Sequence, residues 1–445
     1  LVAIEAERVL AYDNPDVMFR SEFEPDEEAP VAVAFSALSE PSAYWASSDS
    51  GFNQPVAVGG IGDNNLFDGI DGLTDFLVIA HPAFLPLSAT EAHPLNEFIA
   101  LREGEGWNIE TFDITAIQAQ YAGGMPLPEA VNRFLADADT RMTYDHVLLV
   151  GGDSYDYTDN FGLGSISFIP THYTATSFIP HTPSDGLLGD LDGDGLADKA
   201  IGRWPVRSQG DLQAIVDKTV AWENDPNAID DAIWVVDSNE VSGSRSFTAQ
   251  SDRMIDLMLA SGWSEADISR VYFDEVVPAS GMSIADTARG QMFDFMAQGR
   301  SLTGFVGHGA PSMWTFQGLL TPSDLDELYN EGNPTMIGTM TCYTSYFVSP
   351  FSDTVAHRWM NGYREAPSGE QIPGVPNGAV AIHGAATLSN YGQNEVFVRD
   401  VVDAQLDGMT LGQAVESARA KAAASGTTDL VKNWILLGDP TLTLD

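Results

Sequence analysis

The sequence of 445 residues predicts an α/β protein with mostly parallel sheets flanked by helices, and two observations lead to that class. From residue 76 onward, eight bounded apolar runs of strand length follow one another, and most are apolar nearly throughout. Strands that are buried on both faces of a parallel sheet have this composition. Segments with helical periodicity separate the runs, and such alternation is typical of parallel sheets in α/β folds.

Each predicted strand is a bounded run of strand length. In chain order the predicted strands are FLVIA (76–80), WNIETFDI (107–114), HVLLVGG (146–152), AIWVVDS (232–238), RVYFDE (270–275), SLTGFVG (301–307), TMIGTMT (335–341) and GAVAIHG (378–384).

The predicted helices carry apolar residues on one face. Pro128 fits the first turn of PLPEAVNRFLADAD, and Asp211 is expected to cap DLQAIVDKTVAWEN. SDRMIDLMLASG and IADTARGQMFDFMAQG end at Gly262 and Gly299, as helices with C-terminal glycine caps do. TPSDLDELYNEG (321–332) is expected to form a short helix, and LGQAVESARAKAAASG a late amphipathic one.

The chain is expected to have three parts. Residues 1–74 contain only short apolar runs, which indicates a β or irregular region, either a pro-segment or the end of an upstream domain. The Pro- and Asp-rich stretch ENDPNAIDD is the best internal boundary. It separates a first α/β subdomain over 75–231 from a second, adjoining one over 232–445.

The net charge of −44 restricts the classes of partner. Such a surface repels phosphate backbones, so nucleic acid and anionic membranes are not expected to bind. A solvated acidic shell from a salt-adapted bacterium is the simplest explanation of the charge. No apolar run approaches the roughly 18 residues that a membrane-spanning helix needs. The first residue is Leu1, and we expect the chain to be a processed or truncated piece of a longer precursor.

Two predicted strands stop at residues that can carry chemistry. SLTGFVG stops at His308, which lies between Gly307 and Gly309, and TMIGTMT stops at Cys342, the one cysteine of the chain. A short connection between parallel strands follows the right-handed crossover rule, so the two strands are expected to be neighbours. Their carboxyl ends then meet at one edge of the sheet, where ligands bind in α/β folds.

A cysteine and a histidine at one sheet edge indicate nucleophilic catalysis. The thiolate of Cys342 is the nucleophile, and the imidazole of His308 activates it or protonates the leaving amine. The N–H groups of Gly309 and Cys342 are candidates for an oxyanion hole. The alternative is a buried structural cysteine and a turn histidine, and the shared position at strand ends favours the catalytic pair.

This segment resembles the gingipain-like cysteine peptidases of the caspase–hemoglobinase fold group. The matched pattern is an apolar strand, His–Gly, a connecting helix, a second apolar strand and then Cys342. YDHVLLVGGDSYDY upstream and LLGDPTLTLD downstream extend the resemblance over about residues 75–445. The resemblance implies an endopeptidase with His308 and Cys342 as its catalytic dyad and Gly309 in the oxyanion hole.

The resemblance also implies roles for residues around the dyad. Glu240, at the end of VVDSNE, falls where the family places an acidic residue near the histidine, and Tyr391 matches an aromatic wall of the specificity pocket. Gingipains that cut after Arg or Lys carry a carboxylate at the pocket floor, but here the corresponding stretch offers Arg245, Ser246 and Phe247. Arg245 in the pocket would favour an acidic substrate side chain; the alternative is that Arg245 points to solvent.

The stretch GDLDGDGLAD indicates a calcium loop. Four aspartates and one backbone carbonyl occur at the spacing of the first nine positions of such a loop: Asp190, Asp192, Asp194, Leu196 (carbonyl) and Asp198. Ile201 stands where an EF-hand has its bidentate glutamate, so further oxygens must come from elsewhere, and Asp185 is near in sequence. We expect structural Ca²⁺ here, against the alternative of an acidic turn without a metal.

The sequence therefore predicts a calcium-stabilised cysteine endopeptidase, secreted or at the cell surface, whose substrates are proteins or peptides. Two alternatives stay open. The first is a transpeptidase that processes secreted proteins and joins them to an amine. The second is an inactive surface scaffold or adhesion module that keeps the fold and the calcium site.

Overall fold

The computed structural model describes residues 66–70, 72–124, 126–163, 167–224, 231–240, 245–351, 353–365, 371–373 and 375–444. Most of the segment 1–74, for which a β or irregular region is predicted, lies outside the described residues. No helix in the described part of the chain is long and apolar enough to cross a membrane.

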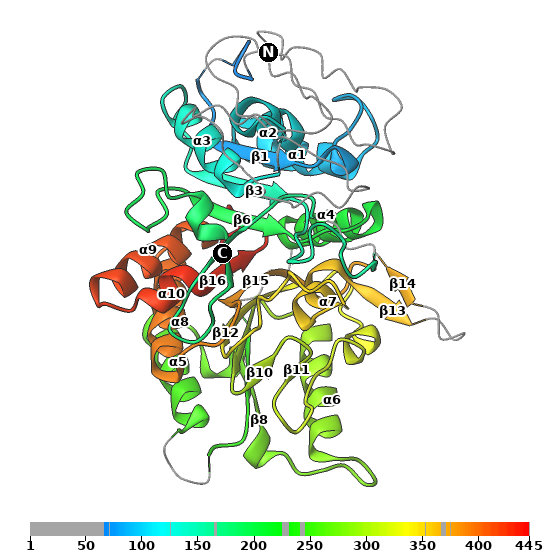
Figure 1. Ribbon diagram of the computed structural model, residues 1–445. Helices are drawn as coiled ribbons and strands as arrows, with labels where there is room; N and C mark the ends of the chain where they lie inside the picture. The colour runs from blue at the N-terminus through cyan, green and yellow to red at the C-terminus, as the bar shows by residue number, and fades with distance from the viewer. Residues whose placement is uncertain are drawn as a thin grey trace, which may run out of the picture.

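A ten-stranded sheet runs through the molecule in the order β2-β1-β3-β6-β16-β15-β12-β9-β7-β8 (Figure 1). Its strands are β1 (Phe76–Ala80), β2 (Ile109–Asp113), β3 (His146–Val150), β6 (Ala200–Trp204), β7 (Ala232–Val236), β8 (Ile268–Tyr272), β9 (Leu302–Val306), β12 (Thr335–Met340), β15 (Ala379–Ala385) and β16 (Trp434–Leu437). Three antiparallel ribbons accompany it: β4 (His172–Thr174) with β5 (Thr182–Ser184), β10 (Gly309–Ala310) with β11 (Met313–Trp314), and β13 (Tyr363–Glu365) with β14 (Gln371–Pro373).

The direction of the large sheet reverses once. β16 pairs parallel with β6 and antiparallel with β15, whereas the other neighbouring strands pair parallel. In Figure 1 the red β16 lies between the green β6 and the orange β15. The strands before residue 231 therefore run opposite to β12, β9, β7 and β8. The carboxyl ends of β9 and β12 consequently lie at the edge where β6 begins.

Ten α-helices and five 3-10 turns in the described residues surround this sheet. They are α1 (Pro94–Gly104), α2 (Ile114–Ala122), α3 (Pro128–Asp139), α4 (Gln209–Glu223), α5 (Phe247–Ala260), α6 (Ile284–Ala297), α7 (Val355–Asn361), α8 (Tyr391–Leu406), α9 (Leu411–Ala424), α10 (Thr428–Asn433), η1 (Pro82–Phe84), η2 (Asp185–Leu188), η3 (Glu265–Asp267), η4 (Phe273–Glu275) and η5 (Asp324–Glu327).

The helices form two outer layers around the sheet. One continuous core packs α1, α4, α6 and α7 against one face of the sheet, with Ile233 and Val235 of β7 in it. On the opposite face, α2 and α3 cover the first half of the sheet, and α5, α8 and α9 cover the second half, where Trp234 and Val236 point. This alternation along β7 explains why buried parallel strands are apolar nearly throughout.

The predicted α/β class with a mostly parallel sheet is confirmed, and all eight predicted strands are present. Two local predictions are wrong. The expected helix over 321–332 is only the 3-10 turn η5. The cap of α4 is Ser208, whose hydroxyl accepts a hydrogen bond from the Asp211 N–H while the Asp211 carboxylate accepts from the Ser208 N–H. Asp211 thus completes a capping box from inside the helix.

Buried charged groups connect segments that are far apart in the sequence. Arg102 of α1 bonds to Asp439 near the chain end at 2.7 Å and to Glu223 of α4 at 2.6 Å. Lys218 of α4 is almost fully buried and donates hydrogen bonds to the carbonyls of Trp359 and Met360 in α7. Buried polar groups of this kind are tolerated because each has hydrogen-bond acceptors.

Lys218→Met should change how stability depends on pH. Burial lowers the pKa of Lys218 from 10.5 to about 7. Between these values the unfolded chain binds a proton that the folded chain does not, so this residue makes stability rise with pH by up to about 1.4 kcal/mol per pH unit. Urea unfolding of the wild type and of Lys218→Met from pH 7 to 10 should show this rise only in the wild type.

The control is Lys421→Met, because Lys421 is half exposed and makes only a 3.6 Å ion pair with Asp400. Its curve should run parallel to that of the wild type. A stability difference between wild type and Lys218→Met that is constant from pH 7 to 10 would contradict a neutral buried lysine.

Candidate active site

His308 and Cys342 follow the ends of two strands that pair directly. β9 and β12 are parallel neighbours in register, with Val306 opposite Met340, as the sequence predicts. His308 and Cys342 each lie two residues beyond these ends, and both line one cavity of about 300 Å³. The structure thus places a thiol and an imidazole at one edge of the sheet.

Positions 307 and 309, on either side of His308, have no room for a side chain. Neither Gly307 nor Gly309 has a positive φ, so backbone conformation does not require glycine at these positions. A Cβ at Gly307 would lie 2.4 Å from the Cβ of Asp237, and a Cβ at Gly309 would lie 2.6 Å from the carbonyl oxygen of Cys342. Only glycine lets the segment after β9 approach the segment after β12 this closely.

The imidazole of His308 is held from three sides. Its Nε2 lies 3.5 Å from Oε1 of Glu240. Phe247 meets the ring edge-on with centroids 5.3 Å apart, and Phe316 stacks on it at 4.6 Å with an interplanar angle of 24°. Glu240 thus lies beside His308, where the family resemblance places an acidic residue.

Asp237 is a site residue that the sequence analysis missed. Asp237 follows β7, the strand next to β9. Its Oδ2 accepts a hydrogen bond from the backbone N–H of His308 at 3.1 Å. The carboxyl group is buried, which raises its pKa, while the N–H groups of His308 and Ser238 act in the opposite direction. The sequence feature that could have identified Asp237 is an acidic residue directly after the apolar strand β7, in addition to the two strands that end before His308 and Cys342.

The thiol of Cys342 has polar neighbours from the segment before α8 and from the first turn of α8. The N–H of Ser389 donates to Sγ at 3.4 Å, and the Ser389 hydroxyl lies 3.6 Å from it. Asn394 holds this hydroxyl at 2.8 Å and also donates to the Thr341 carbonyl at 3.4 Å. An N–H aimed at the sulfur stabilises negative charge there. Sequence reasoning missed Ser389 and Asn394, since nothing local connects them to Cys342.

The cavity beside the dyad contains three of the four predicted substrate-binding residues. Its lining comprises Phe178, Arg245, Phe247, Gly307, His308, Met340, Thr341, Cys342, Ser389, Asn390, Tyr391 and Asn394. Ser246 is not among them. It caps α5 by accepting the Ala249 N–H, and its backbone N–H and C=O both bond to the Tyr391 hydroxyl. Ser246 therefore fixes the pocket wall without lining the pocket.

Among the described residues that line the cavity, Arg245 is the one Lys or Arg, and none carries a carboxylate. Its guanidinium lies 5.6 Å from the centroid of the Tyr391 ring and 3.2 Å from Oε1 of Glu240, the same oxygen that faces His308. The Arg245 side chain is 44% exposed. Arg245 therefore lines the cavity and is also accessible to solvent. The two interpretations offered from the sequence, a pocket residue and a solvent-exposed residue, each describe part of its position.

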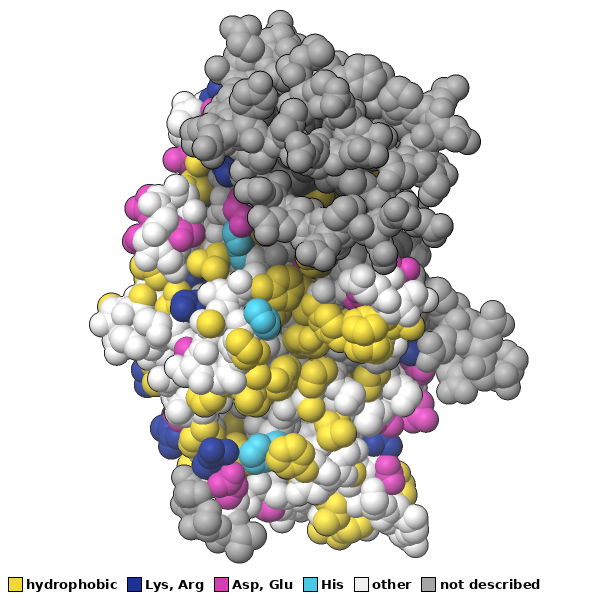
Figure 2. All heavy atoms as spheres, in the orientation of Figure 1, with side chains coloured by type: hydrophobic (Ala, Val, Ile, Leu, Met, Phe, Trp, Pro, Cys, Tyr) yellow, Lys and Arg dark blue, Asp and Glu magenta, His cyan; other side chains and the backbone are white. Residues whose placement is uncertain are grey.

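Figure 2 shows the surface of one face of the molecule, on which hydrophobic side chains gather across the middle. Two aromatic side chains near the dyad are exposed although they are large: Phe178 at 48% and Phe316 at 72%. Phe178 comes from the segment between β4 and β5 and lines the cavity. The first half of the chain therefore also contributes to the site.

The predicted calcium loop gathers three carboxylates. Oxygens of Asp190, Asp192 and Asp194 lie within 4.8 Å of one another. The N–H groups of Gly193 and Gly195, both with positive φ, donate to the Asp190 carboxylate at 2.8 and 2.9 Å. Oxygen donors gathered in this way fit a hard cation such as Ca²⁺.

The other residues around this loop differ in their availability. Asp198 accepts a hydrogen bond from the Leu191 N–H at 2.9 Å, and the Leu196 N–H donates to Asp194 at 2.8 Å. Asp185 is not available as an additional ligand. Both of its oxygens bond to the buried Arg203, at 2.7 and 2.8 Å. The suggestion that Asp185 completes the site is therefore wrong.

Comparison with known proteins decides the family, because the family model of peptidase family C25 matches residues 71–445. The chain belongs to peptidase family C25. This is the gingipain family, so the predicted resemblance is confirmed and the chain is a cysteine-type peptidase. Its substrates are accordingly proteins. No curated protein matches the sequence.

Solved structures share the fold. The Arg-specific cysteine proteinase gingipain R has 18% identity and a TM-score of 0.64, with 84% of this chain and 79% of that chain covered. The complex of the RgpB pro- and mature domains from Porphyromonas gingivalis has 18% identity and a TM-score of 0.63, with 83% and 79% covered. A structure described as a protease has 15% identity and a TM-score of 0.61, with 85% and 81% covered.

Gly309→Ala should lower peptidase activity strongly. The new Cβ would collide with the Cys342 carbonyl and with Oγ1 of Thr341, 2.7 Å away, so the two strand ends must separate. A displacement of about 1 Å at a reacting group costs roughly 100-fold in rate. Peptide hydrolysis and thermal unfolding should be measured together, with Gly290→Ala of α6 as control, since nothing lies within 4 Å of a Cβ there. Equal activities of the two variants would contradict the close approach.

Proposed function

We propose that this peptidase is an endopeptidase in which Cys342 is the nucleophile and His308 the general acid and base. The observation that carries the proposal is the pairing of β9 with β12, which brings both side chains to one cavity. A thiolate beside an imidazole is the standard requirement for acyl transfer through a thioester.

The reaction then proceeds in two steps. The Cys342 thiolate attacks the peptide carbonyl, and collapse of the tetrahedral adduct breaks the C–N bond while His308 gives its proton to the leaving amine. Water next attacks the thioester, His308 takes its proton, and the thiolate leaves as the new carboxylic acid forms. Since Nε2 faces Glu240, these proton transfers use Nδ1.

We assign the oxyanion hole to the N–H groups of Gly309 and Cys342. Support comes from the close approach of Gly309 to the backbone of Cys342. Backbone donors fixed in this way need no reorganisation when charge develops on the carbonyl oxygen. Glu240 orients the imidazole, and Arg245 shares its carboxylate oxygen.

We propose that the specificity pocket is the part of the cavity lined by Arg245 and Tyr391. Gingipain R is described as Arg-specific, but the described residues that line the cavity here include no carboxylate that would pair with a substrate cation. The neighbouring residues 241–244, VSGS, contain no acidic side chain either. We propose that the pocket takes an acidic side chain, whose carboxylate pairs with Arg245.

Secretion or location at the cell surface, with Ca²⁺ bound at the loop, completes the proposal. Asp190, Asp192 and Asp194 would hold the ion together with the Leu196 carbonyl and Asp198. The ion would neutralise repulsion between carboxylates that already lie within 4.8 Å. Its role would be structural, since the loop leads directly into β6 of the central sheet.

The experiment that tests the enzyme is turnover of a fluorogenic peptide library varied at the residue before the scissile bond. The wild type should cleave peptides with Asp or Glu at that position, and Cys342→Ala should lose at least about a thousandfold of that activity. Arg245→Gln should lose the acidic preference and keep activity on uncharged peptides. Ser312→Ala, an exposed change on the ribbon after His308, is the control.

Three outcomes would contradict this account. Cleavage after Arg or Lys would refute the assignment of Arg245. Product joined to an added amine in preference to water would identify a transpeptidase. Turnover that survives in Cys342→Ala would show that Cys342 is not the nucleophile.

Calcium should stabilise the fold. Thermal unfolding with Ca²⁺ and with a chelator should differ, and a concentration 100-fold above Kd corresponds to about 2.7 kcal/mol. Asp192→Asn should abolish the difference, while Asp256→Asn, an exposed carboxylate of α5, should leave it intact. Calorimetric titration gives the stoichiometry, and absence of Ca²⁺ binding would refute the loop as a metal site.

A further inference from the structure

Phe316 stands out because it is a large apolar side chain that is mostly exposed and yet contacts the proposed catalytic base. Phe316 is 72% exposed as a residue, and its ring stacks on the imidazole of His308 with centroids 4.6 Å apart. Phe247, which is buried, meets the same imidazole edge-on at 5.3 Å. The imidazole thus has an aromatic ring on one face and another at its edge, which restricts rotation about its side-chain bonds.

The backbone next to Phe316 is tied to His308. Thr315 has a positive φ of 58°, which is unusual for a β-branched residue, and its N–H donates to the His308 carbonyl at 2.8 Å. The Thr315 hydroxyl accepts a hydrogen bond from the Leu319 N–H at 3.1 Å. The turn that carries Phe316 is therefore closed at both ends, and strain at Thr315 is offset by these bonds.

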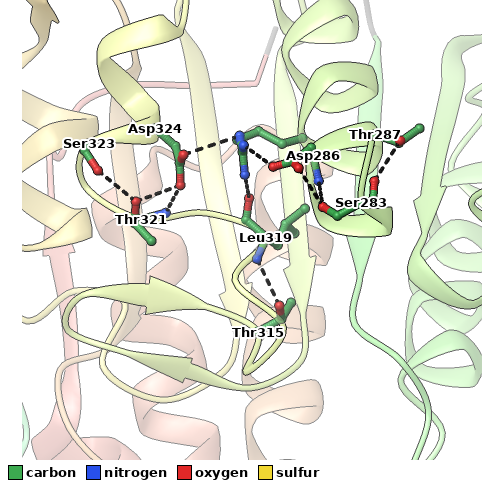
Figure 3. A network of polar contacts seen from close by, with 9 residues as sticks. Ser283, Asp286, Thr287, Thr315, Leu319, Thr321, Ser323 and Asp324 are labelled. Carbon is green, nitrogen blue, oxygen red and sulfur yellow. Dashed lines mark hydrogen bonds and ion pairs between the residues drawn. The ribbon is translucent and has the colours of Figure 1, made fainter. Parts of the chain in front are cut away.

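Arg289 of α6 holds the segment 315–324, which contains Phe316 and which we call the 315–324 loop. We call Arg289 and the two carboxylates that bind it the clamp. Arg289 donates to the Leu319 carbonyl at 3.1 Å and lies 3.5 Å from Asp324, while Asp286 holds the guanidinium at 2.6 Å. Figure 3 shows the loop residues on one side of this network and the start of α6 on the other. One guanidinium thus connects the helix to two points of the loop.

Further bonds at the loop end support the clamp. The Thr321 N–H and hydroxyl both donate to Asp324 at 2.7 Å, and Ser323 lies 3.1 Å from the same hydroxyl (Figure 3). At the helix start, Ser283 caps α6 and donates to Asp286 at 2.7 Å. The carboxylates that hold Arg289 are therefore themselves fixed.

We infer that Phe316 is a positioning residue, which the clamped 315–324 loop presses onto His308 so that the imidazole keeps one orientation toward Cys342. The inference rests on the proposed function of His308. An imidazole that is free to rotate would present its proton to the leaving amine for only part of the time, which lowers kcat and leaves substrate binding intact.

The test compares Phe316→Leu and Phe316→Tyr with Tyr329→Leu. Tyr329 is a matched control: it lies on the same connection between β9 and β12, is 54% exposed, and bonds to Asp294 of α6. Phe316→Leu should lower kcat about tenfold or more, with KM changed less than about twofold. Phe316→Tyr, which restores a flat ring, should recover most of kcat, and Tyr329→Leu should match the wild type.

A double-mutant cycle tests the clamp. Arg289→Met should lower kcat in the same direction as Phe316→Leu, and the double variant should lose no more than the worse single variant, because both changes release the same ring. Additive losses would refute the link between the clamp and Phe316. Thermal unfolding of each variant identifies losses that come from misfolding.

A chemical probe separates this inference from the proposed function. Diethyl pyrocarbonate acylates accessible imidazoles, and peptide mass spectrometry should show His308 modified several-fold faster in Phe316→Leu than in Tyr329→Leu. If the wild type turns over and Phe316→Leu has unchanged kcat, or only a raised KM, the inference is wrong and the proposed function stands. If wild-type turnover is absent or independent of Cys342, the proposed function and the catalytic role of Phe316 both fail.

Discussion

The site depends first on the hydrogen-bonded pairing of β9 with β12. Parallel strands lie about 4.8 Å apart, so in-register pairing fixes where the chain emerges after each strand. His308 and Cys342 both follow these ends, and Gly309 allows the two emerging segments to approach without a clash. Asp237, after the next strand, then accepts the His308 N–H. The geometry of the proposed catalytic pair thus depends on the backbone pairing of the two strands, and side chains such as Glu240 and Ser389 refine it.

Reversal of the sheet at β16 determines which parts of the chain reach this edge. The strands of the first half point their carboxyl ends to the opposite edge, so they supply no strand-end residue to the dyad. Their contribution comes through a loop, which places Phe178 in the cavity wall. Buried polar contacts hold the halves together: Arg102 forms an ion pair between α1 and the chain end, and Lys218 donates hydrogen bonds from α4 to α7. The aspartate loop lies just before β6, so a bound cation would act on the central sheet.

Prediction from sequence worked where the signal was local and periodic. Buried strands could be recognised by their apolar composition. His308 and Cys342 follow the ends of two of them, so the pair could be found from topology rules alone. The short strands β6 and β16 were not identified, since AIGRW carries a buried arginine and WILL follows a helix directly. The helix expected over 321–332 is one 3-10 turn, because Arg289 and Asp324 fix that segment as a loop. Contacts between distant segments, such as Ser389 with Cys342, have no local signature.

The most direct test of the account is whether the imidazole of His308 controls the reactivity of Cys342. Since the chain has one cysteine, alkylation by iodoacetamide can be followed unambiguously by mass spectrometry. The second-order rate constant should be measured at one pH, pH 7, in the wild type and in His308→Ala. We expect the wild-type thiol to react about tenfold faster or more, because the imidazole takes the thiol proton during the reaction. Equal rate constants would show that the two side chains do not act together.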